Sequence, residues 1–375
     1  MLTVFADQHL YKIREIAPTG INLHFYDPEE GFPSQLDQAD ALLVRTVTDI
    51  NKKTLPNIPK NLKFVGTGSA GIDHIDTEYL ASHGIEATNS AGCNARSVAE
   101  YVITALLLWG EQKNITLENE TIGIIGVGHV GQALQKMLDS LGWSYRLYDP
   151  PRSERNPSFE SAELREVLDC SVLTFHTPLH EEGKHSTYHW LNQKKISGRR
   201  YKMVINTARG GVIDGQALMQ AKASGRVEDM IIDVWENEPA FDDNVARTAF
   251  IATPHIAGYS IQAKFRATKM VVDQMVTHFG LDLPIASLNK KKEQITLPDQ
   301  DYDSLSLPDL LTTIHPIKKY GCELNKLIGI ESESKKTKFS RLRTSMPLRN
   351  EYAYLGLPAA LIRSFPFLHK IGINI

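Results

Sequence analysis

The sequence predicts an α/β protein with two doubly wound parallel-sheet domains, followed by a small α+β domain at the C-terminus. Three observations predict this fold class. An apolar run, a Gly-rich or polar turn and an amphipathic stretch recur along residues 1–285, as in βα units of a parallel sheet. These units fall into two series. The 375 residues suffice for two or three domains, and the part after residue 285 differs in charge.

The strands are predicted from short apolar runs that are bounded by turn residues. The first series predicts strands at Leu2–Ala6, Ala41–Val44, Lys63–Gly66 and Ile85–Thr88. The second series predicts them at Thr121–Ile125, Ser144–Tyr148, Val172–Phe175, Met203–Asn206, Met230–Val234 and Phe250–Ala252.

Two longer helical patterns connect the series. Asn94–Gln112 is apolar on almost all sides, which indicates a buried helix running between the domains. Ile256–Gly280 follows the last strand and predicts a second crossing. We therefore expect one domain from residues 1–94 and 257–285, a second from 95–256, and a third from 286–375.

The C-terminal segment, residues 286–375, carries 14 Lys and Arg against 9 Asp and Glu, a balance of +5, whereas the rest carries 27 − 35 = −8. It includes a Lys290–Lys292 run and the charged stretch Glu331–Lys338. Such runs are usually solvated, but the opposite signs also permit docking to another subunit. We expect a small appended domain that supports a homodimer.

Composition excludes several classes of protein. The net charge of −3 provides no basic field for nucleic acid or an anionic membrane. The longest apolar stretch is far shorter than the roughly 20 residues that span a bilayer. The three cysteines are far apart and form no CxxC pair, so we expect a reducing cytoplasm and no disulfide scaffold.

A Gly-rich loop gives the strongest local signal. Gly126-Val-Gly128-His129-Val130-Gly131 follows an apolar strand and opens a helical pattern over Val130–Leu141, which favours a dinucleotide pyrophosphate at the helix N-terminus. Asp149 ends the next strand, where a carboxylate would bind an adenosine ribose and repel a 2′-phosphate. NAD is therefore favoured over NADP, although Arg152 could accommodate that phosphate.

Gly66-Thr-Gly68-Ser-Ala-Gly71 fits the same pattern and also follows a strand. It lacks an acidic residue at the end of the following strand, so it is the weaker candidate for the nucleotide. Its backbone N–H groups could hold the substrate instead.

Three polar residues follow strands of the second series, at the edge where open α/β sheets bind ligands. They are Arg209, Glu238 and His255. An arginine clamps a carboxylate, a histidine exchanges a proton, and a carboxylate orients that histidine. This combination fits oxidation of a 2-hydroxy acid. Taken singly, each residue could be an ordinary loop or surface residue.

His180-Glu-Glu-Gly-Lys-His185 resembles a zinc motif, but its spacing is one residue too long and Gly183 argues against a helix. We read it as a loop and predict no metal site.

Several motifs together resemble the D-isomer-specific 2-hydroxyacid dehydrogenases over about residues 1–285. They are the Gly126 loop, Asn206-Thr-Ala-Arg209-Gly210-Gly, Asp233-Val-Trp-Glu-Asn-Glu238-Pro239 and Thr253-Pro254-His255-Ile-Ala-Gly258. Further pointers, among them Val44-Arg45-Thr46 and Asp149-Pro150-Pro151-Arg152, resemble a branch acting on a phosphorylated 2-hydroxy acid. The resemblance implies a Rossmann NAD domain and a flavodoxin-like substrate domain.

The resemblance also implies roles for individual residues. Arg209, Glu238 and His255 would act in catalysis; Asp149, Thr177, Asp233 and Gly258 would contact NAD; Thr46, Thr67 and Tyr259 would contact the substrate, beside Arg45. Two alternatives remain open. One is a family member acting on 3-phosphoglycerate or a simple 2-hydroxy acid, and the other is an NAD-sensing binding protein without turnover.

Overall fold

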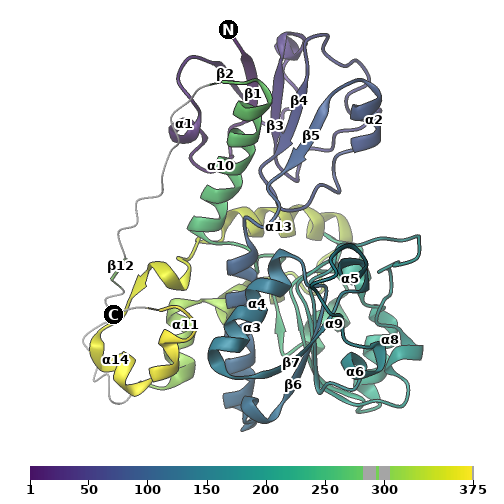
Figure 1. The fold of residues 1–375 in the computed structure, drawn as a ribbon, viewed down its shortest axis with the longest axis vertical. Coiled ribbons are helices and arrows are strands. Elements are labelled where there is room, and N and C mark those ends of the chain that lie inside the picture. The colour runs from purple at the N-terminus through teal and green to yellow at the C-terminus, as the bar shows by residue number, and fades with distance from the viewer. Residues whose placement is uncertain (282–292, 295–304, 374–375) are drawn as a thin grey trace. The chain divides into compact units, whose positions relative to one another are not determined.

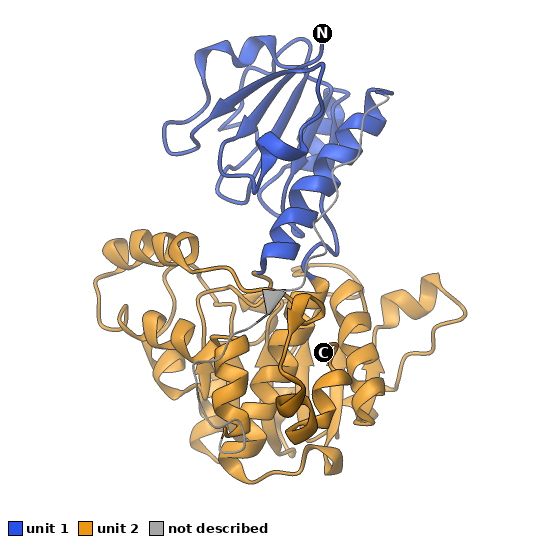
Figure 2. Cartoon of the chain, turned by 90° about the vertical axis from the view of Figure 1, so that its left-hand side faces the viewer, with its two compact units in different colours: residues 1–94, 260–290 blue, residues 95–259, 291–375 orange. Residues whose placement is uncertain are grey.

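The computed structural model describes residues 1–281, 293–294 and 305–373. The chain divides into two compact units, shown separately in Figure 2. Unit 1 comprises residues 1–94 and 260–290, and unit 2 comprises residues 95–259 and 291–375. Each unit contains a parallel sheet with helices, which confirms the predicted fold class. A separate third domain over residues 286–375 stays a prediction, and the Lys290–Lys292 run lies outside the described residues.

Unit 1 is built on a five-stranded parallel sheet in the order β2-β1-β3-β4-β5. Its strands are β1 (Thr3–Asp7), β2 (Asn22–Tyr26), β3 (Ala41–Val44), β4 (Phe64–Thr67) and β5 (Glu86–Asn89). Its helices are α1 (Ile13–Ile16), α2 (Thr77–Ser82) and α10 (Ile261–His278). This order is that of flavodoxin-like sheets, whose ligands bind where the order reverses, between β1 and β3.

Both faces of the unit 1 sheet are buried. On one face, side chains of β1, β3 and β4 pack against α1 and α10, for example Val4 against Ile13 and Val271. On the other face, Phe5 and Leu42 pack with Leu80 of α2. Coverage on both faces explains why the strands read as continuous apolar runs.

Unit 2 is built on a six-stranded parallel sheet in the order β11-β10-β9-β8-β6-β7. Its strands are β6 (Thr121–Ile125), β7 (Ser144–Tyr148), β8 (Val172–Phe175), β9 (Tyr201–Asn206), β10 (Val227–Ile232) and β11 (Ile251–Ala252). Its helices before residue 260 are α3 (Ala95–Lys113), α4 (His129–Leu141), α5 (Pro150–Arg155), α6 (Leu164–Leu168), α7 (Gln193–Ile196), α8 (Gly215–Ala223) and α9 (Asp243–Thr248). The order reverses between β6 and β8.

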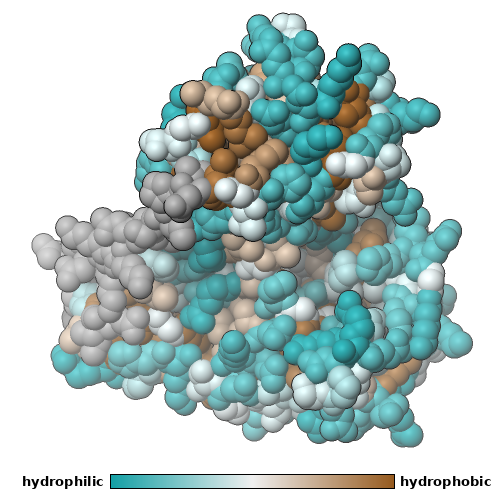
Figure 3. All heavy atoms as spheres, turned by 45° about the horizontal axis from the view of Figure 1, so that its top comes forward, coloured by the Kyte–Doolittle hydropathy of each residue, from teal (hydrophilic) through white to brown (hydrophobic). Residues whose placement is uncertain are grey.

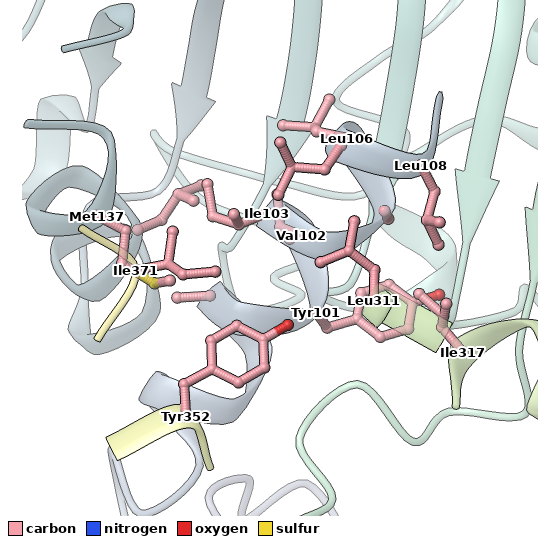
Figure 4. Close-up of a cluster of buried hydrophobic side chains, with 14 of the residues drawn as sticks. Tyr101, Val102, Ile103, Leu106, Leu108, Met137, Leu311, Ile317, Tyr352 and Ile371 are labelled. Atoms are coloured by element: carbon pink, nitrogen blue, oxygen red, sulfur yellow. The ribbon is translucent and has the colours of Figure 1, made fainter. Parts of the chain in front are cut away.

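The described part of the C-terminal segment belongs to unit 2 and packs on its residues 95–259. It contributes a short parallel pair, β12 (Glu293–Gln294) with β13 (Leu355–Gly356), and the helices α11 (Leu307–Ile314), α12 (Ile317–Asn325), α13 (Ser332–Ser345) and α14 (Ala359–Ser364). Leu311, Ile317, Tyr352 and Ile371 join the same core cluster as Tyr101 and Val102 of α3 (Figure 4). Met137 of α4 completes this cluster. The helix α3 is therefore apolar on almost all sides because α4 and the C-terminal segment both cover it.

Every predicted strand is present, with ends that differ by a few residues at most. The sequence missed β2, an edge strand whose residues are mostly half-exposed and thus carry no apolar run. The predicted helix from Ile256 begins only at Ile261, where the Ser260 hydroxyl caps it by accepting from Ala263 N at 2.9 Å. The residues before Ser260 instead form the loop that carries His255, and this loop leads into the long helix α10, which is labelled in Figure 1.

The described surface is mainly polar. On the face drawn in Figure 3, hydrophilic side chains cover most of the described surface and hydrophobic ones form patches between them. Among the described helices, none combines the length and the hydropathy needed to cross a membrane.

Candidate active site

The loop between β6 and α4 has the geometry of a dinucleotide cradle. Gly126 has φ +88°, and a Cβ there would lie 2.7 Å from the carbonyl carbon of His176. A Cβ on Gly131 would lie 2.3 Å from the Gly126 oxygen. At Gly128, by contrast, a Cβ would meet nothing within 4 Å, so the backbone is open to a ligand there. The loop thus combines tight packing behind it with an open middle glycine, as a pyrophosphate requires.

The position of this loop in the sheet supports the same reading. The strands β6 and β8 are neighbours, and the sheet order reverses between them. The loop from Gly126 and the residue Thr177 therefore lie at one edge, the site at which doubly wound sheets bind nucleotides. The helix α4, which starts at His129, begins without a side-chain cap, so its first N–H groups remain available to an anion.

Asp149 lies at the carboxyl end of β7 and is tied to the glycine loop. Its Oδ2 accepts a hydrogen bond from Val127 N at 2.8 Å, and its Oδ1 accepts one from Arg152 N at 3.0 Å. The Arg152 guanidinium donates to the Val127 carbonyl at 2.5 Å and stacks over Phe159, 4.2 Å from the ring centroid. The Arg152 guanidinium is thus held by contacts within the protein, and the charged group that bonds to this end of the glycine loop through its backbone N–H is the Asp149 carboxylate.

Arg209, Glu238 and His255 follow the three neighbouring strands β9, β10 and β11. The structure brings Glu238 and His255 into direct contact, with His255 Nδ1 at 2.8 Å and 2.9 Å from the two carboxylate oxygens. The side chains are 33% and 20% exposed, so the pair is accessible at the surface of unit 2.

The charge of Glu238 determines the tautomer of His255. Burial alone would raise the pKa of Glu238, but His255 and Arg343 beside it lower this pKa below its usual value. The carboxylate is therefore ionised and can only accept, so Nδ1 of His255 carries the hydrogen. This leaves Nε2 as the ring nitrogen that can take or give a proton.

The backbone of the His255 loop is held by Asp233. Asp233 is 1% exposed, and its carboxylate accepts from Thr253 Oγ1 at 2.6 Å, Ile256 N at 2.8 Å and Ala257 N at 3.0 Å. His255 itself lies in the left-handed region, with φ 57°. Such a conformation needs support from its surroundings, and Asp233 supplies it. This structural role is absent from the sequence prediction, which gives Asp233 only an NAD contact.

The loop that carries Arg209 is packed against the chain that follows β10. The backbone carbonyl oxygen of Arg209 accepts a hydrogen bond from Asn206 Nδ2 at 3.0 Å. A Cβ on Gly210 would lie 2.0 Å from the Trp235 backbone, so only glycine fits there. The motif Asn206 to Gly210 thus fixes where the Arg209 side chain begins.

Of the predicted substrate residues, Arg45, Thr46 and Thr67 lie in unit 1, whereas Tyr259 lies in unit 2. Arg45 follows β3, where the sheet order reverses, and its Nε donates to the buried carboxylate of Asp7 at 2.7 Å. Thr46 is exposed, whereas Thr67 is buried and its hydroxyl contacts Ser69 Oγ at 2.9 Å and His74 Nε2 at 3.0 Å. Only Arg45 and Thr46 are therefore presented at a surface of unit 1.

The weaker glycine loop has a packing explanation. A Cβ on Gly66 would lie 2.3 Å from Val271 of α10, and one on Gly68 would lie 2.4 Å from Leu10. These glycines allow close packing inside unit 1 and need no nucleotide to account for them.

Comparisons with known proteins agree with this geometry. Residues 106–257 match the model of the D-isomer specific 2-hydroxyacid dehydrogenase NAD-binding domain. The chain is 36% identical to erythronate-4-phosphate dehydrogenase of Proteus mirabilis, covering 91% of this chain and 90% of that protein. It is also 36% identical to the enzyme of the same name from Bacteroides thetaiotaomicron, covering 95% and 100%.

A solved structure confirms the fold. The NAD⁺-bound 3-phosphoglycerate dehydrogenase of Entamoeba histolytica superposes with a TM-score of 0.60 at 24% identity, covering 75% of this chain and 96% of that one. This likeness concerns the fold alone. The two relatives, with the matched NAD-binding domain, show that the chain belongs to the erythronate-4-phosphate dehydrogenases, within the D-isomer-specific 2-hydroxyacid dehydrogenase family.

Proposed function

We propose that this protein oxidises 4-phospho-D-erythronate to 2-oxo-3-hydroxy-4-phosphobutanoate, with NAD as hydride acceptor, in pyridoxal 5′-phosphate biosynthesis. The observation that carries the proposal is the His255–Glu238 pair, with Nδ1 at 2.8 Å from a carboxylate oxygen and Nε2 left for the substrate. The names of the relatives supply the substrate.

In the proposed reaction, Arg209, His255 and Glu238 have separate roles. Arg209 binds the C1 carboxylate of the substrate by two hydrogen bonds and polarises the C2–O bond. Nε2 of His255 removes the proton of the C2 hydroxyl, and Glu238 stabilises the imidazolium that results. The chemistry that bound NAD would supply is a hydride acceptor for C2. In the reverse direction, His255 returns the proton to the oxygen.

The cofactor would be held by the glycine loop, with Gly126, Gly128, His129, Val130 and Gly131, and by Asp149, Thr177, Asp233 and Gly258. The open backbone at Gly128 and the uncapped N-terminus of α4 support a bound pyrophosphate. Arg45 and Thr46 at the end of β3, and Tyr259, would bind the substrate, and the guanidinium and hydroxyl suit a phosphate. The predicted contact of Thr67 would require its buried hydroxyl to leave Ser69 and His74.

The substitution D149N tests the cofactor assignment. It keeps an acceptor for Val127 N but removes the charge that repels a 2′-phosphate. We expect the preference for NAD over NADP to fall by about tenfold or more, because one to two kcal/mol of repulsion is lost. The measurement is kcat/KM with each cofactor. An unchanged ratio would show that Asp149 is not the ribose ligand.

The substrate assignment is tested by comparing NADH formation with 4-phospho-D-erythronate, 3-phosphoglycerate and D-lactate under one set of conditions. A preference of orders of magnitude for the first supports the proposal. If another acid wins, the chain is a dehydrogenase of different specificity. If none reacts while NADH still binds, an NAD-sensing protein becomes the better description.

We further propose a cytoplasmic homodimer in which residues 286–375 contribute to assembly. The positive balance of this segment against the negative rest of the chain supports self-association. Truncation is a poor test, because Leu311, Ile317 and Tyr352 cover α3 and their removal would expose its apolar side. We expect the full chain to scatter light with twice the 42.0 kDa mass of one chain. A mass of one chain at micromolar concentration would contradict the dimer.

A further inference from the structure

One side chain of the C-terminal segment reaches the candidate catalytic pair. Arg343, in the last turn of α13, places Nη1 3.4 Å from Glu238 Oε1, across 105 positions of the chain. Its guanidinium carbon also lies 5.9 Å from the centroid of the Tyr259 ring. The Arg343 side chain is 23% exposed, so much of its charge faces Glu238 and Tyr259 within the protein.

One face of α13, the helix that carries Arg343, is held by the chain segment that follows β10. Lys335, Phe339 and Arg343 follow one another at intervals of four residues, which aligns them on one side of α13. Lys335 Nζ donates to Asp243 Oδ1 at 2.6 Å. Phe339 is fully buried, and its ring lies 5.8 Å from that of Phe241. Two anchors thus hold the third residue of this face at Glu238.

Charged and polar groups from several elements surround the His255–Glu238 pair. Glu238 contacts Nδ1, and the buried carboxylate of Asp233 lies under the loop. Arg343 approaches from α13, and Tyr259 lies beneath its guanidinium. Tyr101 of α3 meets Thr253, which donates to Asp233. Among these described groups, Arg343 is the cation that faces the pair.

We propose that Arg343 is a positioning residue of the dehydrogenase site: it holds the Glu238 carboxylate in place against His255. The proposal rests on the proposed function. A carboxylate that contacts His255 on one side and a guanidinium on the other stays ionised and oriented. The C-terminal segment would thereby complete the active site of its own chain, in addition to any role in assembly.

Another arginine of this segment has a different place. Arg349 is one candidate for a tail residue that reaches the active site of the partner subunit, a question that the sequence alone leaves open. In the structure its side chain is 3% exposed, and Nη1 donates to Glu100 Oε2 of α3 at 2.6 Å. Arg349 therefore anchors the segment to α3, and Arg343 is the arginine at the catalytic pair.

The test compares R343Q and R343K with R341Q, a control on the same helix whose side chain is exposed. A misplaced Glu238 slows the proton transfer by His255, whereas the affinity for the substrate should change little. We expect R343Q to lower kcat by about 10- to 100-fold, with KM changed less than about threefold. R343K should restore most of kcat, and R341Q should behave as wild type.

A second measurement does not depend on turnover. The Nδ1–H resonance of His255, observed by NMR in the protein without substrate, reports the hydrogen bond to Glu238. In R343Q this proton should exchange faster with water. An unchanged exchange rate, with kcat unchanged, would overturn the proposal. A large rise in KM with kcat unchanged would also overturn it, because Arg343 would then bind the substrate directly. If the wild-type protein itself fails to oxidise 4-phospho-D-erythronate, the proposed function fails, and the exchange rate of the Nδ1 proton still tests Arg343.

Discussion

The substitution H255N is expected to lower kcat about 10³- to 10⁴-fold, near the upper end of what general acid–base catalysis contributes. The reason is that Nε2 of His255 is the nitrogen that removes the hydroxyl proton, with Nδ1 fixed by Glu238 at 2.8 Å. Asparagine is the suitable replacement because His255 has φ 57°, a left-handed conformation that asparagine tolerates and alanine does not. The backbone bonds from Asp233 to the loop should therefore survive.

The measurements are steady-state NADH formation and NADH binding by fluorescence, which should stay within about threefold of wild type if only the proton transfer is lost. A matched control exists in the same unit. His189 also has a positive φ, 46°, and its Nε2 lies 2.7 Å from Glu236 Oε1. His189 lies between β8 and β9, and its side chain bonds to Glu236 and not to Glu238. H189N should therefore keep near-normal turnover. Near-normal turnover in H255N would remove His255 from the mechanism.

The fold was largely predictable because both sheets are parallel and buried on both faces, so their strands are continuous apolar runs. The exceptions have physical reasons. The strand β2 lies at a sheet edge and is half-exposed, so it carries little apolar signal. The apolar residues Ile256 and Ala257 look helical in sequence, but their N–H groups bond to Asp233 and the helix starts later.

The candidate site was predictable where a local motif encodes it. The glycine loop and the residues after β9, β10 and β11 stand at fixed places beside strands, so position along the chain implies position in the sheet. The role of Asp233 was missed because two of its three partners are backbone N–H groups, which leave no trace in side-chain spacing. Arg343 was missed because its contact with Glu238 depends on how α13 docks, and the sequence prediction for this region was limited to the charged stretch Glu331–Lys338.

The buried contacts of α3 show the same limit. Its apolar sequence correctly indicates a buried helix, but the sequence cannot say what covers it. In the structure the cover includes Leu311, Ile317 and Tyr352 of the C-terminal segment. Long-range packing of this kind is decided by shape complementarity between distant segments, for which one sequence contains no local pattern.

The substitution R209K is expected to lower kcat/KM about 10²- to 10³-fold, because a planar guanidinium binds a carboxylate by two parallel hydrogen bonds and an ammonium does not. The position of the side chain is set by Asn206, which donates to the Arg209 carbonyl, and by Gly210, which packs against the Trp235 backbone. Neither contact involves the guanidinium, and its own bond to the loop, from Nη1 to the Ala208 carbonyl at 2.9 Å, is one that an ammonium can also make. R209K should therefore leave this loop in place. Both kcat and KM should change, because Arg209 acts on the bound carboxylate and on the C2–O bond.

R226K provides the control for R209K, since Arg226 is exposed and precedes β10 at the opposite end of the strand from the candidate site. It should leave kcat/KM unchanged. The decisive comparison is the affinity of R209K for the 2-oxo acid in the presence of NADH, measured by fluorescence titration. Weaker binding of the acid with unchanged binding of NADH would locate the loss at the carboxylate. Equal loss of both would instead mean that the loop after β9 had collapsed, and unchanged turnover would show that another cation holds the substrate.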